Sequence, residues 1–157
     1  MLLVCNASPL IFLAKIDLID VLPQLTENLT IPIGVYQEIK GQNDAACEWV
    51  DKHKNKYVIE IDTTPKVIES WDLGKGETEV ITHAYSRKDV KAALDDKAAR
   101  NCAASLGISV IGTIGLILVA NKKGHIEKPV AYLEKLKETG FRIGDDLLEH
   151  AIRLAGK

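Results

Sequence analysis

The sequence predicts an α/β protein, a three-layer α/β/α sandwich in which helices cover both faces of a central, mainly parallel sheet. Short apolar runs alternate with helical periodicities along the whole chain, and this alternation is typical of parallel strands joined by crossover helices. The apolar runs alternate little with polar residues, as expected of strands covered on both faces. The length of 157 residues suits one domain. We expect a single domain over 1–157, with 129–157 as an interface appendage.

Caps and turns divide the first half of the chain. The apolar run Leu2–Cys5 ends at Asn6, and Ser8 followed by Pro9 is typical of an N-cap and the first residue of a helix. That helix should end near Pro23, because proline interrupts a helix interior. The expected elements of this half are strands at 2–5, 29–31 and 57–61 and helices at 9–23, 35–40 and 44–54, the last capped by Asp44.

Prolines, glycines and small polar residues divide the second half in the same way. Pro65 opens a short helix, Gly74 and Gly76 form a flexible loop before a helix that starts at Glu77, and Thr113 can cap a later helix. The expected elements here are strands at 91–94 and 108–111 and helices at 65–71, 77–85, 97–106, 113–123, 129–140 and 145–155.

Composition excludes several classes of protein. Hydrophobic residues make up 46 % of the chain and charged residues 27 %, which excludes a disordered or fibrous chain. The net charge is −2, so the chain does not bind nucleic acid through an overall positive field. Contact with nucleic acid would need a local basic patch or bound cations.

The cysteines and the apolar start of the chain bear on its compartment. Cys5, Cys47 and Cys102 are widely spaced, and the chain has no C-x-x-C pair, which favours a reducing, cytoplasmic setting over a zinc or redox site. The apolar start lacks the basic region of a signal peptide. No stretch reaches the roughly 18 uninterrupted apolar residues of a membrane span. We therefore expect a cytoplasmic protein with no membrane partner.

Polar side chains collect where predicted strands end and helices begin. These candidates are Asn6, Ser8, Glu38, Glu77, Asp95, Asp96 and Thr113. Ligands bind outside the carboxyl ends of the strands in open parallel sheets, so a doubly wound sheet would bring these side chains to one edge. Several carboxylates there would raise each other's pKa. A bound Mg²⁺ or Mn²⁺, which prefers oxygen ligands, would relieve that repulsion.

Each candidate also has a purely structural interpretation. Glu77 suits the first turn of any helix because of the helix dipole, and Ser8 and the pair Asp95–Asp96 are good N-caps. Glu38 could be a solvated helix residue, and Asn6 could stabilise a turn through its side-chain amide. Their joint placement, more than any one residue, favours a site.

An ordered set of short motifs resembles the PIN-domain ribonuclease family, and within it a prokaryotic branch often found beside antitoxin-like partners. The matching segments are 6–10 (NASPL), 31–38 (IPIGVYQE), 73–79 (LGKGETE), 94–100 (LDDKAAR), 110–113 (VIGT) and 140–143 (GFRI). An acidic helix start follows the last of these segments. The segments occur in the order expected for the family and cover nearly the whole chain.

The resemblance implies a PIN-like parallel-sheet fold and a metal-dependent endoribonuclease that uses Mg²⁺ or Mn²⁺. The acidic positions of the family fall on Asn6, Glu38, Glu77 (with Glu79 as the alternative) and either Asp95 or Asp96, and its small hydroxyl positions fall on Ser8 and Thr113. Asn6 departs from the pattern, because the family prefers aspartate there. An amide can still offer its carbonyl oxygen to a metal ion, but it supplies no charge.

The resemblance also implies partners. RNA is the expected substrate, and an antitoxin-like protein is an expected partner. Separately, the final helix, as an interface element, leads us to expect a homodimer. Lys75 and Arg100 are the local cations that we would test for phosphate contact.

Two other functions compete with the nuclease. The first is a non-catalytic binding module with the PIN fold, favoured by Asn6 and by the net charge of −2. The second is a phosphoryl-transfer domain with an aspartate nucleophile. Its only support is Asp95–Asp96 at a strand end, without the accompanying D-x-D-x-[TV] pattern.

Overall fold

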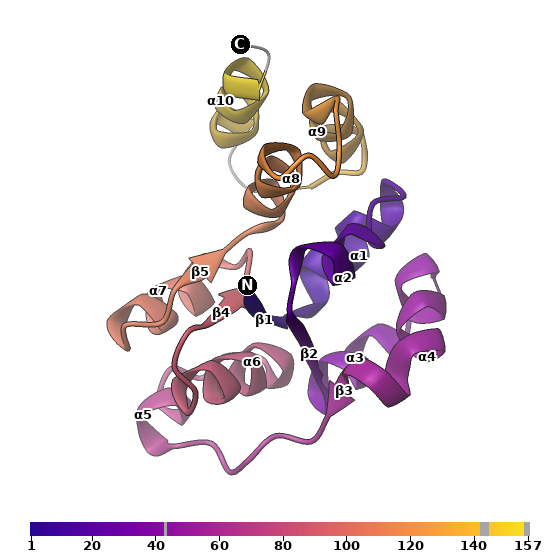
Figure 1. Ribbon diagram of the computed structural model, residues 1–157. Helices are drawn as coiled ribbons and strands as arrows, with labels where there is room; N and C mark the ends of the chain where they lie inside the picture. Colours follow the sequence, from indigo (N-terminus) through magenta and orange to yellow (C-terminus); the bar gives the residue numbers. More distant parts are fainter. Residues whose placement is uncertain (43, 142–144, 156–157) are drawn as a thin grey trace.

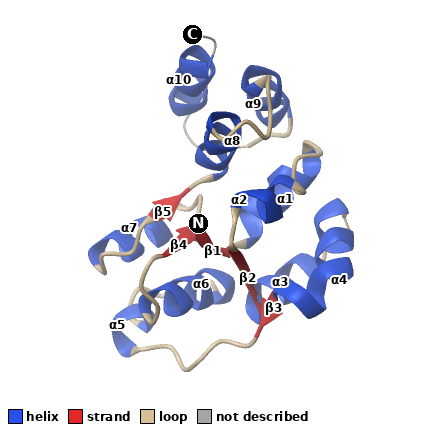
Figure 2. Ribbon diagram, in the orientation of Figure 1, coloured by secondary structure: helices blue, strands red, loops and turns tan. Residues whose placement is uncertain are grey.

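The computed structural model describes residues 1–42, 44–141 and 145–155, which form one parallel sheet flanked by helices (Figures 1 and 2). The strands are β1 (Leu2–Cys5), β2 (Asn28–Pro32), β3 (Val58–Ile59), β4 (Val90–Ala93) and β5 (Val110–Ile111). Their order is β3-β2-β1-β4-β5. Leu3 of β1 pairs in parallel with Leu29 of β2 and with Lys91 of β4. The chain therefore winds outward from β1 in one direction and then from β4 in the other.

The helices form a layer on each face of the sheet. They are α1 (Ala7–Lys15), α2 (Val21–Leu25), α3 (Ile33–Lys40), α4 (Ala45–Tyr57), α5 (Lys66–Glu69), α6 (Lys75–Tyr85), α7 (Lys97–Ser105), α8 (Thr113–Lys122), α9 (Pro129–Glu138) and α10 (Asp145–Ala155). Helices α5, α6 and α7 cover one face, and α1, α2, α4 and α8 cover the other, with α9 and α10 beyond α8 (Figure 1). The predicted α/β/α sandwich with a parallel sheet is confirmed.

The first helix is shorter than the sequence predicted. Helix α1 ends at Lys15, and the chain turns at Asp17, whose φ is +57°, before α2 begins at Val21. Pro23 is the third residue of α2, where its missing N–H costs nothing because the first-turn N–H groups have no acceptor within the helix. The prediction of one continuous helix as far as Pro23 was wrong.

Smaller differences affect the bounds of other elements. Helix α4 continues to Tyr57, so β3 keeps only Val58–Ile59 of the predicted strand. Helix α6 begins at Lys75, so half of the predicted glycine loop is its first turn. Asp44 caps α4 as predicted, and its carboxylate accepts a hydrogen bond of 3.1 Å from the backbone N–H of Cys47.

Apolar side chains fill the space between the sheet and both helical layers. The fully buried ones include Leu3, Leu10, Ile31, Ile81 and Leu116. Phe12 of α1 and Phe141, which follows α9, form an edge-to-face pair with ring centroids 4.9 Å apart, so the end of α9 is anchored beside α1. The rest of the 140–143 motif, at positions 142–143, lies outside the described residues. Among the described residues, no helix combines the length and hydrophobicity needed to span a bilayer.

Candidate active site

The topology creates a crevice between β1 and β4. These two strands are neighbours, but the chain leaves them in opposite directions, and ligands bind at such a switch point at the carboxyl ends of the strands. Asn6 directly follows β1, and Asp95 and Asp96 follow β4. A cavity of about 320 Å³ opens there, lined by Asn6, Ser8, Phe12, Glu77, Asp95, Asp96, Gly140 and Phe141.

Asp95 is buried and accepts three hydrogen bonds. Its Oδ2 accepts bonds of 2.6 Å from the hydroxyls of both Ser8 and Thr113, and its Oδ1 accepts a bond of 2.8 Å from the backbone N–H of Thr113. The carboxylate therefore joins the end of β4 to the starts of α1 and α8. Its negative charge also lies at the N-terminus of α8, where the helix dipole favours an anion.

The two hydroxyl residues are therefore not the N-caps that local sequence suggested. Asn6 is the N-cap of α1, and Gly112 is the N-cap of α8. Ser8 is the second residue of α1 and Thr113 the first residue of α8, and the hydroxyls of both donate hydrogen bonds to Asp95. A bond to an ionised carboxylate is stronger than a neutral cap, which accounts for this arrangement.

Asp96 has a structural role and also lines the cavity. It is the N-cap of α7, and its Oδ2 accepts a hydrogen bond of 2.9 Å from the backbone N–H of Ala99. Its side chain is otherwise exposed to the cavity. The capping interpretation is thus correct for Asp96, and it leaves Oδ1 available to a ligand.

Gly76 brings Asn6 and Glu38 together. Gly76 lies in the first turn of α6, and a Cβ atom there would be 2.9 Å from Glu38 Oε2 and 3.2 Å from Asn6 Oδ1. Both oxygens therefore face the same point. Asn6 Oδ1 is sealed from solvent and is the one buried side-chain polar atom without a hydrogen-bond partner in the described part of the chain.

Glu77 experiences the charges of its neighbours. Burial raises the pKa of this half-buried carboxyl above its ordinary value, and the charges of Asp96 and then Glu38 raise it further, whereas a hydrogen bond with the backbone of Gly74 acts in the opposite direction. The carboxylates of Glu38 on α3, Glu77 on α6 and Asp96 at the N-cap of α7 are therefore close enough to influence the pKa of Glu77.

Glu79 is not part of this group. Its Oε1 accepts a hydrogen bond of 3.0 Å from the backbone N–H of Gly34 at the start of α3, and it does not line the cavity. A Cβ atom on Gly34 would clash with Glu79 Oε2, so the glycine is needed for the contact. Glu79 thus holds α3, which carries Glu38, against α6, which carries Glu77.

Neither of the two candidate cations lines this cavity. The Nζ of Lys75 donates a hydrogen bond of 2.9 Å to Gln37 Oε1 at the surface. Arg100 is half-buried on α7, and a Cβ atom on Gly112 would lie 2.9 Å from Arg100 Nη1 and 3.0 Å from Asp95 Oδ1. Arg100 and Asp95 also line an adjoining hollow of about 290 Å³.

The donor set suits a hard divalent cation. The described residues contain no group of three or more carboxylates, histidines or cysteines already gathered closely enough to hold a metal ion. However, the unpartnered oxygen of Asn6 beside the Glu38 carboxylate is an arrangement that a cation would stabilise. Mg²⁺ and Mn²⁺ are bound through oxygen atoms, and Mg²⁺ usually keeps several waters beside one or two carboxylates. The residues therefore fit such an ion.

A comparison with protein families identifies the fold. A family model described as a PIN domain matches residues 2–157. The chain belongs to the PIN-domain family. PIN domains are generally nucleases that bind nucleic acid and use divalent metal ions, so the coarse functional class of this PIN domain is that of a nuclease. No curated protein matches the chain at a significant level.

Sequence reasoning missed the apolar part of the PIN-domain cavity. Phe12, Gly140 and Phe141 complete its wall. Gly140 and Phe141 belong to the 140–143 motif, but their contact with Phe12 joins segments far apart in the chain and has no local signal. The roles of Gly76 and Gly112 were also missed. Both lie in short motifs that the resemblance identified, so their position beside Glu77 and Thr113 was the available clue.

Proposed function

We propose that this PIN domain is an endoribonuclease that hydrolyses RNA phosphodiesters with Mg²⁺ or Mn²⁺, as the toxin of a toxin–antitoxin pair. The observation that carries the proposal is the buried, unpartnered Oδ1 of Asn6 facing the Glu38 carboxylate beside the acidic cavity. An acceptor without a partner is costly in a protein interior, and a cation held between these oxygens removes that cost.

In this proposal the acidic residues divide the work. Asn6, Glu38 and Asp96 offer oxygen atoms to the metal ion, and Asp95 offers the lone pairs that its three hydrogen bonds leave free. Glu77, whose pKa is raised by burial, orients the attacking water and can accept its proton. The bound ion would neutralise charge on the scissile phosphate. Lys75 and Arg100 contact neighbouring phosphates.

The rival proposal is a PIN fold that binds partners without catalysis. Two observations favour it: Asn6 provides no charge, and no three metal-ligating side chains are already gathered among the described residues. The two proposals differ in whether millimolar Mn²⁺ binds at Asn6 and Glu38.

RNA cleavage decides between them. The purified protein is incubated with a single-stranded RNA in Mn²⁺, in Mg²⁺ and in EDTA. We expect cleavage that EDTA abolishes, and a loss of at least roughly tenfold in rate for Asp96→Asn and for Glu77→Gln, since each removes a charge from the metal site. Glu48→Gln, an exposed change on α4, is the matched control. Equal rates in all four proteins would point to a contaminating nuclease.

We also propose that the segment 129–157 carries the interface to a second copy of the chain. Leu147 and Leu154 lie two turns apart on α10 and are 48 % and 51 % exposed, although large apolar side chains are normally covered. A monomeric wild-type protein, measured by light scattering, would contradict this. The free, buried cysteines support a reducing cytoplasmic setting.

A further inference from the structure

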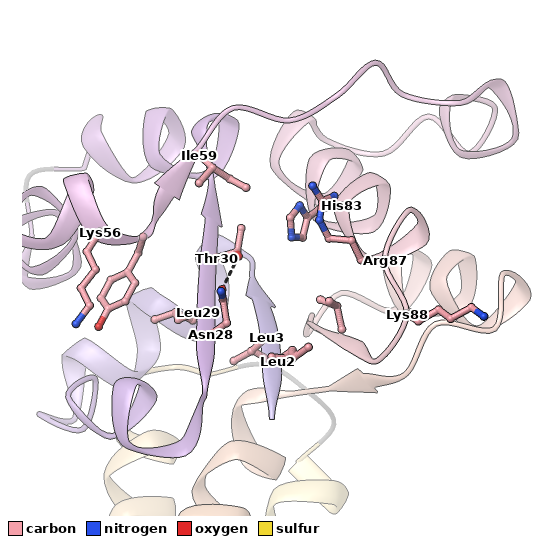
Figure 3. A pocket seen from close by; sticks show the side chains of 12 residues that line it. Leu2, Leu3, Asn28, Leu29, Thr30, Lys56, Ile59, His83, Arg87 and Lys88 are labelled. Carbon is pink, nitrogen blue, oxygen red and sulfur yellow. Dashed lines mark hydrogen bonds between the residues drawn. The ribbon is translucent and has the colours of Figure 1, made fainter.

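A second cavity lies at the amino ends of the strands, on the opposite edge of the sheet from the acidic cavity (Figure 3). The first residues of β1, β2 and β4, which are Leu2, Asn28 and Val90, border it. Its volume is about 620 Å³, which is within the range of small-molecule sites. The proposed nuclease does not use it.

The charged walls of this cavity are all cationic. Lys56 from α4 and Arg87 and Lys88 from the loop after α6 line it, and no lining residue is acidic. Among the described residues none of these three cations takes part in an ion pair. All three residues are exposed, and Figure 3 shows Arg87 beside His83, Lys56 on the other side of β2, and the Lys88 side chain directed away from both. Arg87 is therefore the cation that an anion beside His83 would contact.

His83 adds an imidazole to the same wall. The residue is 6 % exposed and lines the cavity. Among the described residues neither ring nitrogen has a hydrogen-bond partner, and neither is sealed from solvent as Asn6 Oδ1 is. Figure 3 shows the ring beside Arg87. Burial and then the charge of Arg87 lower the pKa of His83, while Asp62 acts in the opposite direction. An anion between His83 and Arg87 would satisfy both donors.

The floor of the cavity is apolar. Ile59 of β3 pairs with Pro32 and so shares a face of the sheet with Thr30, on the side of β2 where His83 lies. Leu29 points to the other side of β2 (Figure 3), and the ring of Tyr57 also lines the cavity. Thr30 and Asn28, whose side chains are joined by a hydrogen bond of 3.3 Å, are the neutral polar groups at its centre (Figure 3). A free inorganic anion would leave this floor uncovered, whereas an anion with an apolar or aromatic body would cover it.

We infer that this cavity binds an organic phosphate, with the phosphate between His83 and Arg87 and the body of the molecule against Thr30 and Ile59. A phosphate monoester presents several acceptor oxygens and more than one negative charge, which matches an imidazole beside a guanidinium better than a single carboxylate does. Nucleoside monophosphates combine such a phosphate with a flat, partly apolar base.

The test is calorimetric titration of the full chain with AMP and with adenosine, in EDTA so that no metal contributes. We expect AMP to bind, adenosine to bind at least roughly tenfold more weakly, and Arg87→Gln to weaken AMP by a similar factor, because a bond to a charged group is lost. Lys123→Gln, an exposed change at the end of α8, should leave AMP binding unchanged. Equal affinities for AMP and adenosine, or equal losses of AMP affinity in Arg87→Gln and Lys123→Gln, would overturn the inference.

A second measurement locates the ligand. The imidazole resonances of His83 should shift on AMP addition, and unshifted resonances at saturation would place the ligand elsewhere and refute the assignment. A 5′-phosphorylated dinucleotide that binds as well as AMP would identify an RNA end as the source of the phosphate, whereas binding of AMP alone would identify a free nucleotide. Neither readout involves cleavage, so failure here would leave the nuclease proposal untouched.

Discussion

Replacing Gly76 by alanine tests whether the meeting point of Asn6 and Glu38 is a metal site. The added Cβ would lie 2.9 Å from Glu38 Oε2 and 3.2 Å from both Asn6 Oδ1 and Val35 Cγ2. It would therefore occupy the point that both oxygens face. The carboxylate of Glu38 is at the end of an exposed, flexible side chain, so it would move away from Asn6.

The change should cost little in folding but much in metal binding. Alanine is favoured over glycine within a helix by roughly 1 kcal/mol, and this gain opposes the strain at Asn6 and Val35. We expect the free energy of unfolding in EDTA to change by less than about 1 kcal/mol, or roughly 2–4 °C in melting temperature. Displacement of one protein ligand should weaken Mn²⁺ binding at least tenfold, about 1.4 kcal/mol.

Gly74→Ala is the matched control, because it lies two residues away in the same motif. A Cβ atom there would be 3.8 Å from Glu77 Oε2, an ordinary van der Waals contact. Calorimetric Mn²⁺ titration and thermal melting in EDTA are measured for both variants. If Gly76→Ala bound Mn²⁺ as tightly as the wild type while folding normally, Asn6 and Glu38 would not share a metal ion.

Three other perturbations have expected outcomes. Asn6→Asp should lower the melting temperature in EDTA through repulsion with Glu38 and gain more than the wild type on addition of Mn²⁺; an unchanged response to Mn²⁺ would remove Asn6 from the metal site. The raised pKa of Glu77 means that its contribution to stability is present below the ordinary value of 4.5 and is lost as the pH rises. Thermal melts in EDTA should therefore show Glu77→Gln to be more stable than the wild type at pH 7 but not below pH 4.5. A gain in melting temperature that did not depend on pH would contradict an origin in the Glu77 charge. Thr113→Val removes a buried hydroxyl donor to Asp95 and should cost about 1.5–3 kcal/mol in chemical denaturation, whereas Thr63→Val, at an exposed position, should cost little.

The fold was predictable because its signals are local. Each strand is a short apolar run, and each crossover helix has its own periodicity and caps, such as Asp44 at α4. The alternation of strands and helices then requires parallel pairing. The same locality put Asn6 after β1 and Asp95 after β4, so their common edge followed from topology alone.

The errors arose where a distant residue competes with a local preference. Ser8 and Thr113 are good N-caps by sequence. In the fold, the Ser8 hydroxyl instead donates a hydrogen bond to the buried carboxylate of Asp95, 87 positions away. Glu79 and Glu77 are both glutamates of the same short motif, and the sequence does not distinguish them. In the fold, however, the Glu79 carboxylate accepts a hydrogen bond from the backbone N–H of Gly34, 45 positions away. These choices depend on which groups the finished fold brings within hydrogen-bond distance.

The net charge of the chain does not reveal that the two edges of the sheet carry charges of opposite sign. Glu77, Asp95 and Asp96 line the cavity at the carboxyl edge of the sheet. Arg87 lies beside His83 at the amino edge, where no acidic residue lines the cavity. β1 has four residues, which at about 3.3 Å per residue separates the edges by more than the Debye length of about 8 Å at physiological salt. A ligand at one edge is therefore governed by the charges of that edge. For this reason a net charge of −2 excludes non-specific nucleic-acid binding but neither a cation site at one edge nor a phosphate site at the other.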